Sequence, residues 1–568
     1  MVSVADSSSG RPLPAMLKRI GLTAALAALC LALFLPGFFT LPPTDRDEAR
    51  FAQATRQMLE SGDFVDIRFQ DEARHKKPVG IHWMQSATVA LAGGPEQAAI
   101  WAYRLPSLAG AVLAVLLTFR IGTTLFGPLS GAPAGERAGQ GAGFLAAAML
   151  AGTVLLAVEA RTAKTDAALL AAVLGAQAAL AEAWLRRNGR EAPSTGLVLL
   201  FWCSLGVGIL LKGPIILLVV GGTALGLALV ERRVGWLAPL RPRLGLPVLL
   251  LIVAPWLVLI TIKTQGAFFA ESVGHDMLAK VAGGRESKGF PPGYHTLLFP
   301  VTFWPWSLLA IPAIPWVWAN RRDPAVLFCL AWAIPTWAVF EAVPTKLFHY
   351  VLPAYPALAL LTARAALDGF GGGRRWLRVL SILLFLLISA VLAAGTVILY
   401  GFFEWTVDRV SLLLAAAVLA VLGYGALLFH RGGLRRSVAV LSAGSVGMYL
   451  LAFQVVLPRI EKIWISPRVA AAVAAARPCP GSTLVSVGFT EPSLVFLVGT
   501  GTVLSGDGRT AAHRLADDAC ALALVDLPQD DAFLAEAEAK GFQPIAIETV
   551  SGLNYSRGTK PMMTLYRR

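Results

Sequence analysis

Long apolar blocks, separated by short charged segments, dominate the pattern of residues along the chain. The blocks at 21–39, 244–262 and 379–400 are each close to the roughly 20 residues that a helix needs to cross a bilayer. About thirteen such spans are expected, with boundaries that are soft by a few residues. They fall at residues 16–38, 101–124, 141–159, 165–185, 196–211, 213–230, 244–263, 296–318, 325–342, 347–368, 377–400, 407–429 and 437–457. The pattern therefore predicts a polytopic α-helical membrane protein.

The composition excludes several other classes of protein. Of the 568 residues, 56% are hydrophobic and 15% are charged, whereas a soluble globular chain carries about 25% charged residues. A soluble enzyme, a fibrous protein and a disordered chain are thereby excluded. The net charge of +14 would suggest a nucleic acid partner in a soluble protein. Here the positions of the basic residues explain the charge better, and no nucleic acid partner is expected.

The basic residues concentrate in every second loop between the expected spans, which is typical of cytoplasmic loops. This predicts a cytoplasmic N-terminus and, because the number of spans is odd, a periplasmic C-terminal tail. The first span could alternatively be read as a cleaved signal peptide. Its apolar stretch is long, however, and residues 36–43 show no small-x-small cleavage site, which disfavours that interpretation.

Two domains are expected, a transmembrane domain at residues 1–460 and a small periplasmic α/β domain at 461–568. The second has a mixed composition, with expected strands at 482–489, 493–498, 521–527 and 544–550 and a helix at 531–540. Cys479 and Cys520 both fall in it, on the oxidising side of the membrane. They form either a disulfide or two unpaired buried thiols. Residues 2–10 are expected to be disordered.

The two long outer loops, at 39–100 and 264–295, differ from the short inner ones. The first contains residues at helical spacing in 47–61 and 79–91, which predicts two helices lying on the membrane surface. Long loops on an otherwise tightly connected bundle are where function concentrates. They indicate a site that faces the periplasm.

Ionisable residues collect at the outer ends of the spans, where charge close to lipid is costly and by default indicates function. Each cluster also has a structural alternative, which is helix capping for the acids and headgroup contact or snorkelling for the cations. The candidates are Asp47, Glu48 and Arg50 after the first span, Lys77 in the first outer loop, Asp166 at the start of the fourth span, Lys212 between the fifth and sixth, and Lys346 before the tenth.

Together these residues indicate a transferase that uses an activated lipid donor. The periplasm has no ATP, and the chain has neither a P-loop nor a Rossmann glycine fingerprint. A sugar on a polyprenyl phosphate fits, because its tail enters from the bilayer and its phosphate can meet Lys or Arg. A carboxylate would then deprotonate an acceptor hydroxyl.

Several motifs carry a resemblance to a known family. The runs DEARF at 47–51, LESGDF at 59–64 and KP at 77–78 resemble the first periplasmic loop of the ArnT-like glycosyltransferases. These belong to the membrane GT-C superfamily, alongside the protein O-mannosyltransferases. The runs TD at 165–166, KGP at 212–214 and KLFHYVLP at 346–353 are similar to further motifs of the family. The likeness extends over about residues 40–356.

The resemblance implies roles for the candidates. Asp47 would be the general base of an inverting reaction and Asp166 the second acid, and Glu48 stays open as an alternative base because only the resemblance separates it from Asp47. Lys77, Arg50 and Tyr350 would hold the lipid phosphate, with Lys346 and Lys212 as further cations of the site. The donor would be undecaprenyl phosphate carrying a sugar, and the acceptor lipid A or another envelope glycan at the bacterial inner membrane.

A metal ion is the one cofactor that the resemblance leaves open. His275 resembles a family position at the mouth of the cavity, where it could be a metal ligand. The family often has Glu before the Lys-Pro pair, whereas His75 and Lys76 stand there in this chain. A carboxylate-dependent divalent metal site at His275 is therefore in question.

Three other functions stay open at this point. A protein O-glycosyltransferase of the same superfamily would use the same donor chemistry. A lipid transporter or flippase would be expected to show inverted repeats and interrupted spans, and the sequence shows neither. An envelope scaffold would use the C-terminal domain to bind partners and would tolerate exchange of the acids in the first outer loop.

Overall fold

The computed structural model describes residues 15–127, 133–187, 193–278, 290–372 and 374–568, so the segment 2–10 lies outside it. Within these residues, nine helices are long and apolar enough to cross a membrane. They are α1 (Ala15–Phe34), α4 (Ile100–Phe126), α7 (Asp166–Leu185), α8 (Thr195–Lys212), α10 (Pro242–Thr264), α15 (Pro324–Ala342), α17 (Arg375–Glu404), α18 (Arg409–His430) and α19 (Leu434–Tyr449), which continues to Arg459. The expected polytopic α-helical membrane protein is confirmed, and the number of thirteen spans stays a prediction.

The remaining expected spans coincide with helices outside this set. These are α5 (Pro133–Gly152), α6 (Val154–Glu159), α9 (Ile215–Glu231), α13 (Tyr294–Thr302), α14 (Ser307–Ala319) and α16 (Tyr355–Leu367). The expected span 141–159 is divided between α5 and α6 at Thr153, whose Oγ1 accepts a hydrogen bond from the N–H of Leu156. The expected span 296–318 is likewise divided between α13 and α14.

Small residues let the central helices approach closely, as is common in membrane bundles. A Cβ added at Gly110 of α4 would lie 2.7 Å from backbone atoms of Ala168 in α7. A Cβ added at Gly122 would lie 2.5 Å from Gly143 of α5. Neither glycine leaves room for a side chain, so these positions set the distance at which α4 packs on both neighbours.

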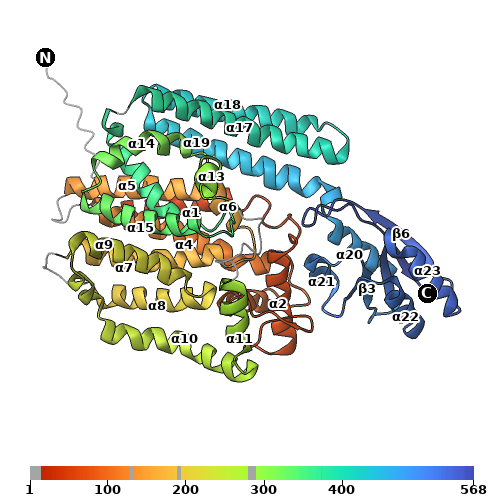
Figure 1. Ribbon diagram of the computed structural model, residues 1–568. Helices are drawn as coiled ribbons and strands as arrows, with labels where there is room; N and C mark the ends of the chain where they lie inside the picture. Colours follow the sequence, from red (N-terminus) through yellow and green to blue (C-terminus); the bar gives the residue numbers. More distant parts are fainter. Residues whose placement is uncertain (1–14, 128–132, 188–192, 279–289, 373) are drawn as a thin grey trace, which may run out of the picture.

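The two helices expected in the first outer loop are present as α2 (Asp47–Ser61) and α3 (Gly80–Leu91). Between them lies a short hairpin of β1 (Arg68–Phe69) and β2 (Glu72–Ala73). Figure 1 shows α2 between the end of the helical bundle and the C-terminal domain. The loop between α10 and α13 contains α11 (Ala267–Phe269) and η2 (Ala270–Leu278) at the same end of the bundle.

The C-terminal residues form a five-stranded sheet with helices around it, as Figure 1 shows at the C-terminal end of the chain. The strand order is β4-β3-β5-β7-β6. Strands β3 (Leu484–Val487), β4 (Val503–Ser505) and β5 (Leu522–Asp526) are parallel, and β6 (Ile545–Ser551) and β7 (Met562–Arg567) are antiparallel. The helices are α20 (Ile465–Ala476), α21 (Pro492–Val498), α22 (Gly508–Asp517) and α23 (Asp530–Ala539). The small α/β architecture expected here is present.

One expected strand is wrong. Residues 493–498 form the helix α21, which begins at Pro492. A short apolar run is compatible with a buried strand or with a buried helix, and its periodicity does not separate them. Pro at the first helical position favours the helix, because its fixed φ suits the first turn and its missing N–H costs nothing there.

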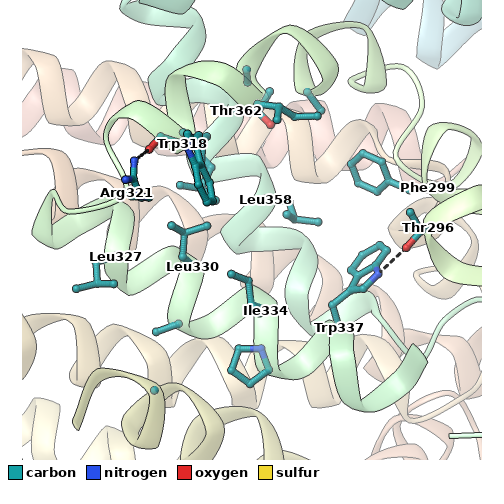
Figure 2. A pocket seen from close by; sticks show the side chains of 18 of the residues that line it. Thr296, Phe299, Trp318, Arg321, Leu327, Leu330, Ile334, Trp337, Leu358 and Thr362 are labelled. Carbon is teal, nitrogen blue, oxygen red and sulfur yellow. Dashed lines mark hydrogen bonds between the residues drawn. The ribbon is translucent and has the colours of Figure 1, made fainter. Parts of the chain in front are cut away.

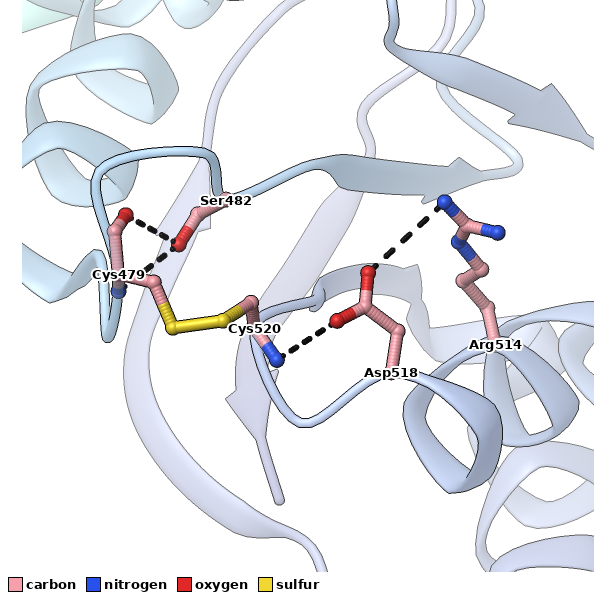
Figure 3. Close-up of a disulfide and its surroundings, with 5 residues drawn as sticks. All are labelled: Cys479, Ser482, Arg514, Asp518 and Cys520. Atoms are coloured by element: carbon pink, nitrogen blue, oxygen red, sulfur yellow. Dashed lines mark hydrogen bonds and ion pairs between the residues drawn. A yellow bond between two sulfur atoms is a disulfide. The ribbon is translucent and has the colours of Figure 1, made fainter.

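A disulfide joins Cys479 to Cys520, with 5.5 Å between their Cα atoms. Figure 3 shows the polar contacts beside it. The hydroxyl of Ser482 donates to the carbonyl of Cys479 at 2.8 Å, and the N–H of Cys520 donates to Oδ1 of Asp518 at 2.9 Å. Of the two alternatives left by the sequence, the structure has the disulfide.

Candidate active site

A cavity of about 310 Å³ lies at the end of the bundle that faces the C-terminal domain. Its wall joins the start of α2, the segment between the hairpin and α3, the end of α8 and the segment that leads into α16. The charged and ring-bearing residues that line it are Asp47, Arg50, Arg74, Lys76, Lys77, Asp166, Lys212, Asp276, His349 and Tyr350. Apolar residues complete it, among them Leu169, Val339, Phe340, Leu347 and Leu352. The cavity therefore combines five cations and three acids with apolar residues.

Asp47 is the carboxylate at the start of α2, and cations surround it. Burial alone would raise its pKa, but the positive charges of Lys77, Lys164 and Arg74 outweigh burial and bring the pKa down to about 2. Asp47 is therefore ionised at neutral pH. The helix N-terminus favours the same charge state.

Lys77 interacts electrostatically with Asp47, and its Nζ lies 5.0 Å from the centre of the Phe51 ring. The guanidinium of Arg74 lies over the same ring at 4.7 Å, so Phe51 supports both cations. Burial, together with the nearby charge of Lys212, brings the pKa of Lys77 down to about 8, although Asp47 and Asp166 act in the opposite direction. Lys77 therefore carries a charge that can be removed slightly above neutral pH.

Asp166, the first residue of α7, is the second acid of the cavity. Its Oδ1 accepts a hydrogen bond from Nζ of Lys212 at 2.5 Å, and Nε2 of His349 lies 3.8 Å from the same oxygen. On the other side of the imidazole, Nδ1 lies 3.8 Å from Oε1 of Glu159. Lys164 donates to that Glu159 oxygen at 3.0 Å. The pairs Lys212–Asp166 and Lys164–Glu159 are thus linked through the imidazole of His349 in one buried network.

Glu48 points away from the cavity. Its two oxygens lie 2.7 and 3.1 Å from nitrogens of Arg104, and both side chains are 1% exposed. The backbone N–H groups of Thr44 and Ala163 donate to the same carboxylate at 2.8 and 2.9 Å. Glu48 therefore links α2 to α4 and to the loop before α7, and among the described residues it does not line the cavity.

The predicted phosphate-binding residues divide into two groups. Arg50, Lys77, Lys212 and Tyr350 line the cavity, and Nζ of Lys212 lies 5.3 Å from the centre of the Tyr350 ring. Lys346 is buried and donates instead to the carbonyls of Phe340, at 3.0 Å, and Glu341. The structure therefore does not bring Lys346 to the cavity wall with the others.

The described residues do not assemble a metal site. Within them, no group of three or more His, Cys, Asp and Glu side chains is arranged to hold a metal ion. His275 lies in η2, and its side chain is outside what the structure describes. His75 is buried, with its Nε2 2.8 Å from Oδ1 of Asp66, and the neighbouring Lys76 brings a cation to the cavity. No step is therefore assigned to a metal.

Two residues of the site, Arg74 and Glu159, were not among the sequence candidates, while Lys164 and His349 stood inside the candidate clusters 161–166 and 344–353 without a role of their own. Arg74 stands directly before the run HKKP at 75–78, and Lys164 lies two residues before Asp166. Their charge and position were visible in the sequence. The sequence did not show that Lys164 pairs with Glu159, because this contact depends on α6 ending at Glu159.

A second, larger cavity of about 810 Å³ lies along α14, α15 and α16 (Figure 2). Its wall is almost entirely apolar, with Phe299, Trp318, Ile334 and Trp337 among the labelled side chains. The single charged residue of its lining is Arg321, in the part of the chain that the structure describes. This groove can hold an apolar chain but has no carboxylate for acid or base chemistry.

The chain is similar in sequence to known membrane transferases. A sequence model of the family described as dolichyl-phosphate-mannose-protein mannosyltransferase matches residues 76–259. The chain is 27% identical over 382 residues to an undecaprenyl phosphate-alpha-4-amino-4-deoxy-L-arabinose arabinosyl transferase of Aeromonas hydrophila subsp. hydrophila, which covers 65% of this chain and 66% of that protein. A transferase of the same description from Pseudomonas fluorescens is 26% identical, covering 65% and 61%. The chain thus matches just under two thirds of the length of these curated relatives.

The fold likeness covers more of the chain. The crystal structure of ArnT from Cupriavidus metallidurans bound to undecaprenyl phosphate superposes with a TM-score of 0.73 and 20% sequence identity, over 97% of this chain and 98% of that one. The likeness shows the fold, a polytopic helical membrane domain followed by a C-terminal α/β domain. The resemblance to the ArnT-like glycosyltransferases, first seen in the sequence motifs, is confirmed.

Proposed function

We propose that the protein transfers a sugar from a polyprenyl-phosphate donor to lipid A or a related envelope acceptor. The observation that carries this proposal is the cavity in which Asp47 faces Lys77 and Arg74 beside an apolar wall. A lipid phosphate needs cations for its phosphate group and an apolar surface for its hydrocarbon chain. We assign the cavity and the C-terminal domain to the periplasmic side of the inner membrane, in agreement with the basic loops expected in the cytoplasm.

The donor phosphate would bind to the cations of the cavity. Lys77, Arg50 and Lys212 line one side of it, and Tyr350 adds a hydroxyl. Lys acts as a point charge and Arg can bind two phosphate oxygens at once. The first isoprene units would lie along the apolar residues of the cavity, near Phe340.

Asp47 is proposed as the general base. Its carboxylate takes the proton of the acceptor hydroxyl, and the acceptor oxygen attacks the anomeric carbon. The bond from that carbon to the phosphate oxygen breaks, and the lipid phosphate leaves with the electron pair. One displacement inverts the anomeric centre, and no nucleotide is needed.

The low pKa of Asp47 fits this role once the donor is bound. A carboxylate with a pKa of about 2 is a weak base. A phosphate that binds between Lys77 and Arg74 neutralises the charges that lower this pKa, so the pKa of Asp47 rises in the complex. Asp166 keeps Lys212 and His349 in place and would be the second acid of the site.

The names of the relatives favour one class of donor. The curated relatives are described as transferring 4-amino-4-deoxy-L-arabinose from undecaprenyl phosphate, and we propose the same class of donor, with lipid A as acceptor. The family model is described as a protein mannosyltransferase, so a protein acceptor is the second candidate.

Mass spectrometry of lipid A, envelope glycans and envelope proteins, with and without the gene, tests this proposal. The expected result is the loss of one sugar from lipid A or a related glycan in the deletion strain, with recovery on complementation. Loss of a sugar from proteins alone would favour the protein acceptor. Unchanged glycans and proteins, together with lipid movement in reconstituted vesicles, would favour the flippase.

A further inference from the structure

The C-terminal domain contacts the chain at the two residues that directly precede Asp47. The backbone N–H of Asp45 donates a hydrogen bond of 2.8 Å to Oη of Tyr555. The guanidinium of Arg46 donates to the backbone carbonyl of Ser556. Both partners belong to the turn that precedes β7, more than 500 residues away along the chain.

A third contact reaches Asp45 from α21. The hydroxyl of Ser493 donates to Oδ1 of Asp45, and Oγ of Ser466 lies 2.6 Å from Oγ of Ser493. Ser466 and Ser493 are 3% and 1% exposed. The Asp45 backbone and side chain are therefore held by two different parts of the same domain.

The turn that carries Tyr555 is itself anchored inside the domain. Glu491 is 2% exposed and accepts hydrogen bonds from Nδ2 of Asn554 at 2.9 Å and from Oγ of Ser556 at 2.7 Å. Nε of Arg557 lies 3.1 Å from the same carboxylate. Because one buried acid holds residues on both sides of Tyr555, its hydroxyl is presented to Asp45 in a fixed position.

The backbone at Arg46 is strained. Its φ is 65° and its ψ is −108°, values that a residue other than glycine rarely adopts. Such a conformation persists only where the surrounding structure imposes it, and it costs about 1–3 kcal/mol. Here the strained residue lies between the clamped Asp45 and Asp47, which opens α2.

The domain also holds the far end of α2. Nη1 of Arg56 donates to the carbonyl of Phe496 at 2.9 Å, and Nε2 of Gln53 donates to Oγ1 of Thr500 at 2.8 Å. The ring of Phe496 packs edge-on against Tyr103 of α4, with 5.2 Å between the ring centres. The helix that begins with Asp47 is therefore fixed along its length by a domain that does not line the cavity.

We propose that the C-terminal domain positions the Asp47 carboxylate, with Tyr555 and Ser493 as the positioning residues. This inference rests on the proposed role of Asp47 as the base. The two residues act through Asp45 and the strained peptide at Arg46, which together set the direction of the first turn of α2. A displacement of about 1 Å at a catalytic group can cost about 100-fold in rate, so weak contacts outside the cavity can control transfer.

The test compares Tyr555→Phe, Ser493→Ala and the double variant in the full-length reconstituted protein. Each single change removes one hydrogen bond to Asp45, so kcat is expected to fall about 3- to 10-fold, and about 10- to 100-fold in the double variant. The KM for the donor should stay within about twofold, because the phosphate-binding residues are untouched. Hydrogen exchange of the peptide at 43–51 should become faster.

Tyr566→Phe is the matched control, since its hydroxyl bonds to Asp530 inside the same domain. It should leave kcat and the exchange of residues 43–51 unchanged. In an Asp47→Asn background, Tyr555→Phe should have no further effect on the residual rate, because the carboxylate that it positions is gone.

A double variant with the kcat of the original protein would overturn the inference. So would an equal loss of kcat in Tyr566→Phe, which would indicate a general effect of domain stability. If the double variant fails to fold, Tyr555→Phe alone decides, because it removes only one oxygen. Full activity of Asp47→Asn would instead overturn the proposed function itself, whatever the Tyr555 variant shows.

Discussion

The carboxylate of Glu48 lies 2.7 Å from Nε of Arg104, and both side chains are 1% exposed. This pair joins the first turn of α2 to α4, while the adjacent Asp47 faces the cavity. Burial would raise the pKa of Glu48, but the charge of Arg104 holds it below its usual value. Both neighbouring acids lie beside cations, but only Asp47 lines the cavity and can meet a substrate there.

Glu48→Ala should destabilise the protein by about 3–5 kcal/mol, because it leaves the Arg104 charge buried without its partner. Thermal unfolding in detergent measures the change. The control is Asp368→Asn, which removes a half-exposed partner of Arg364 and should cost at most about 0.5 kcal/mol. Equal effects of the two changes would contradict a structural role for Glu48.

The pKa of about 8 at Lys77 predicts an alkaline limit to activity. As the pH rises through 8, Lys77 loses its proton and with it the charge that binds the donor phosphate, so kcat/KM should fall. In Lys77→Arg the cation persists to much higher pH, and the alkaline limb should move up by more than one pH unit. If the fall of kcat/KM stays near pH 8 in Lys77→Arg, the titrating group is one other than Lys77.

Asp45 predicts a pH dependence of stability. Burial, aided by the charge of Glu491, raises its pKa from 3.8 to about 6, against hydrogen bonds from Ser493 and Tyr555. The folded state therefore binds a proton that the unfolded state has lost, and stability falls as the pH rises from about 4 to about 6, by up to about 3 kcal/mol. Asp45→Asn keeps an oxygen for Ser493 and removes this fall. The unfolding midpoints of the original protein and of Asp45→Asn at pH 4.5 and 7.5 measure this difference. Equal changes of the midpoint with pH in the two proteins would contradict the role of Asp45.

The disulfide should stabilise the C-terminal domain. Cys479 and Cys520 are 41 residues apart, and closing a loop of that length stabilises by about 4 kcal/mol in the chain-entropy model. Cys479→Ser/Cys520→Ser should lower the unfolding midpoint of the domain, whereas Cys203→Ser, which removes an unpaired thiol in α8, should not. If both proteins unfold at the same temperature, the bridge contributes nothing measurable.

The sequence predicted the helical spans well because their signal is long and apolar, as in α10 and α17. Both helices of the first outer loop were also found, and α2 has the predicted bounds of 47–61. The strand predicted at 493–498 was wrong, because a short apolar run has too few residues for its periodicity to distinguish a helix from a strand. Helix or strand was decided there by Pro492 and by packing against α2.

The candidate site was predicted in part, because charge near lipid is rare and therefore conspicuous. Asp47, Lys77, Asp166 and Lys212 came together in one cavity. The direction of a side chain was not predictable, since Lys346 turns to backbone carbonyls and Glu48 turns to Arg104. Those outcomes depend on helix packing across distant parts of the chain, which one sequence does not encode locally.

The rate of sugar transfer by Asp47→Asn tests the central claim most directly. The purified variant and the original protein are given the polyprenyl-phosphate sugar and its acceptor, with Asp71→Asn, an exposed acid of the same outer loop, as the matched control. Asp47→Asn should fold, bind the donor and lose about 100- to 10,000-fold in kcat, while Asp71→Asn keeps its rate. Transfer by Asp47→Asn at the original rate would contradict the account.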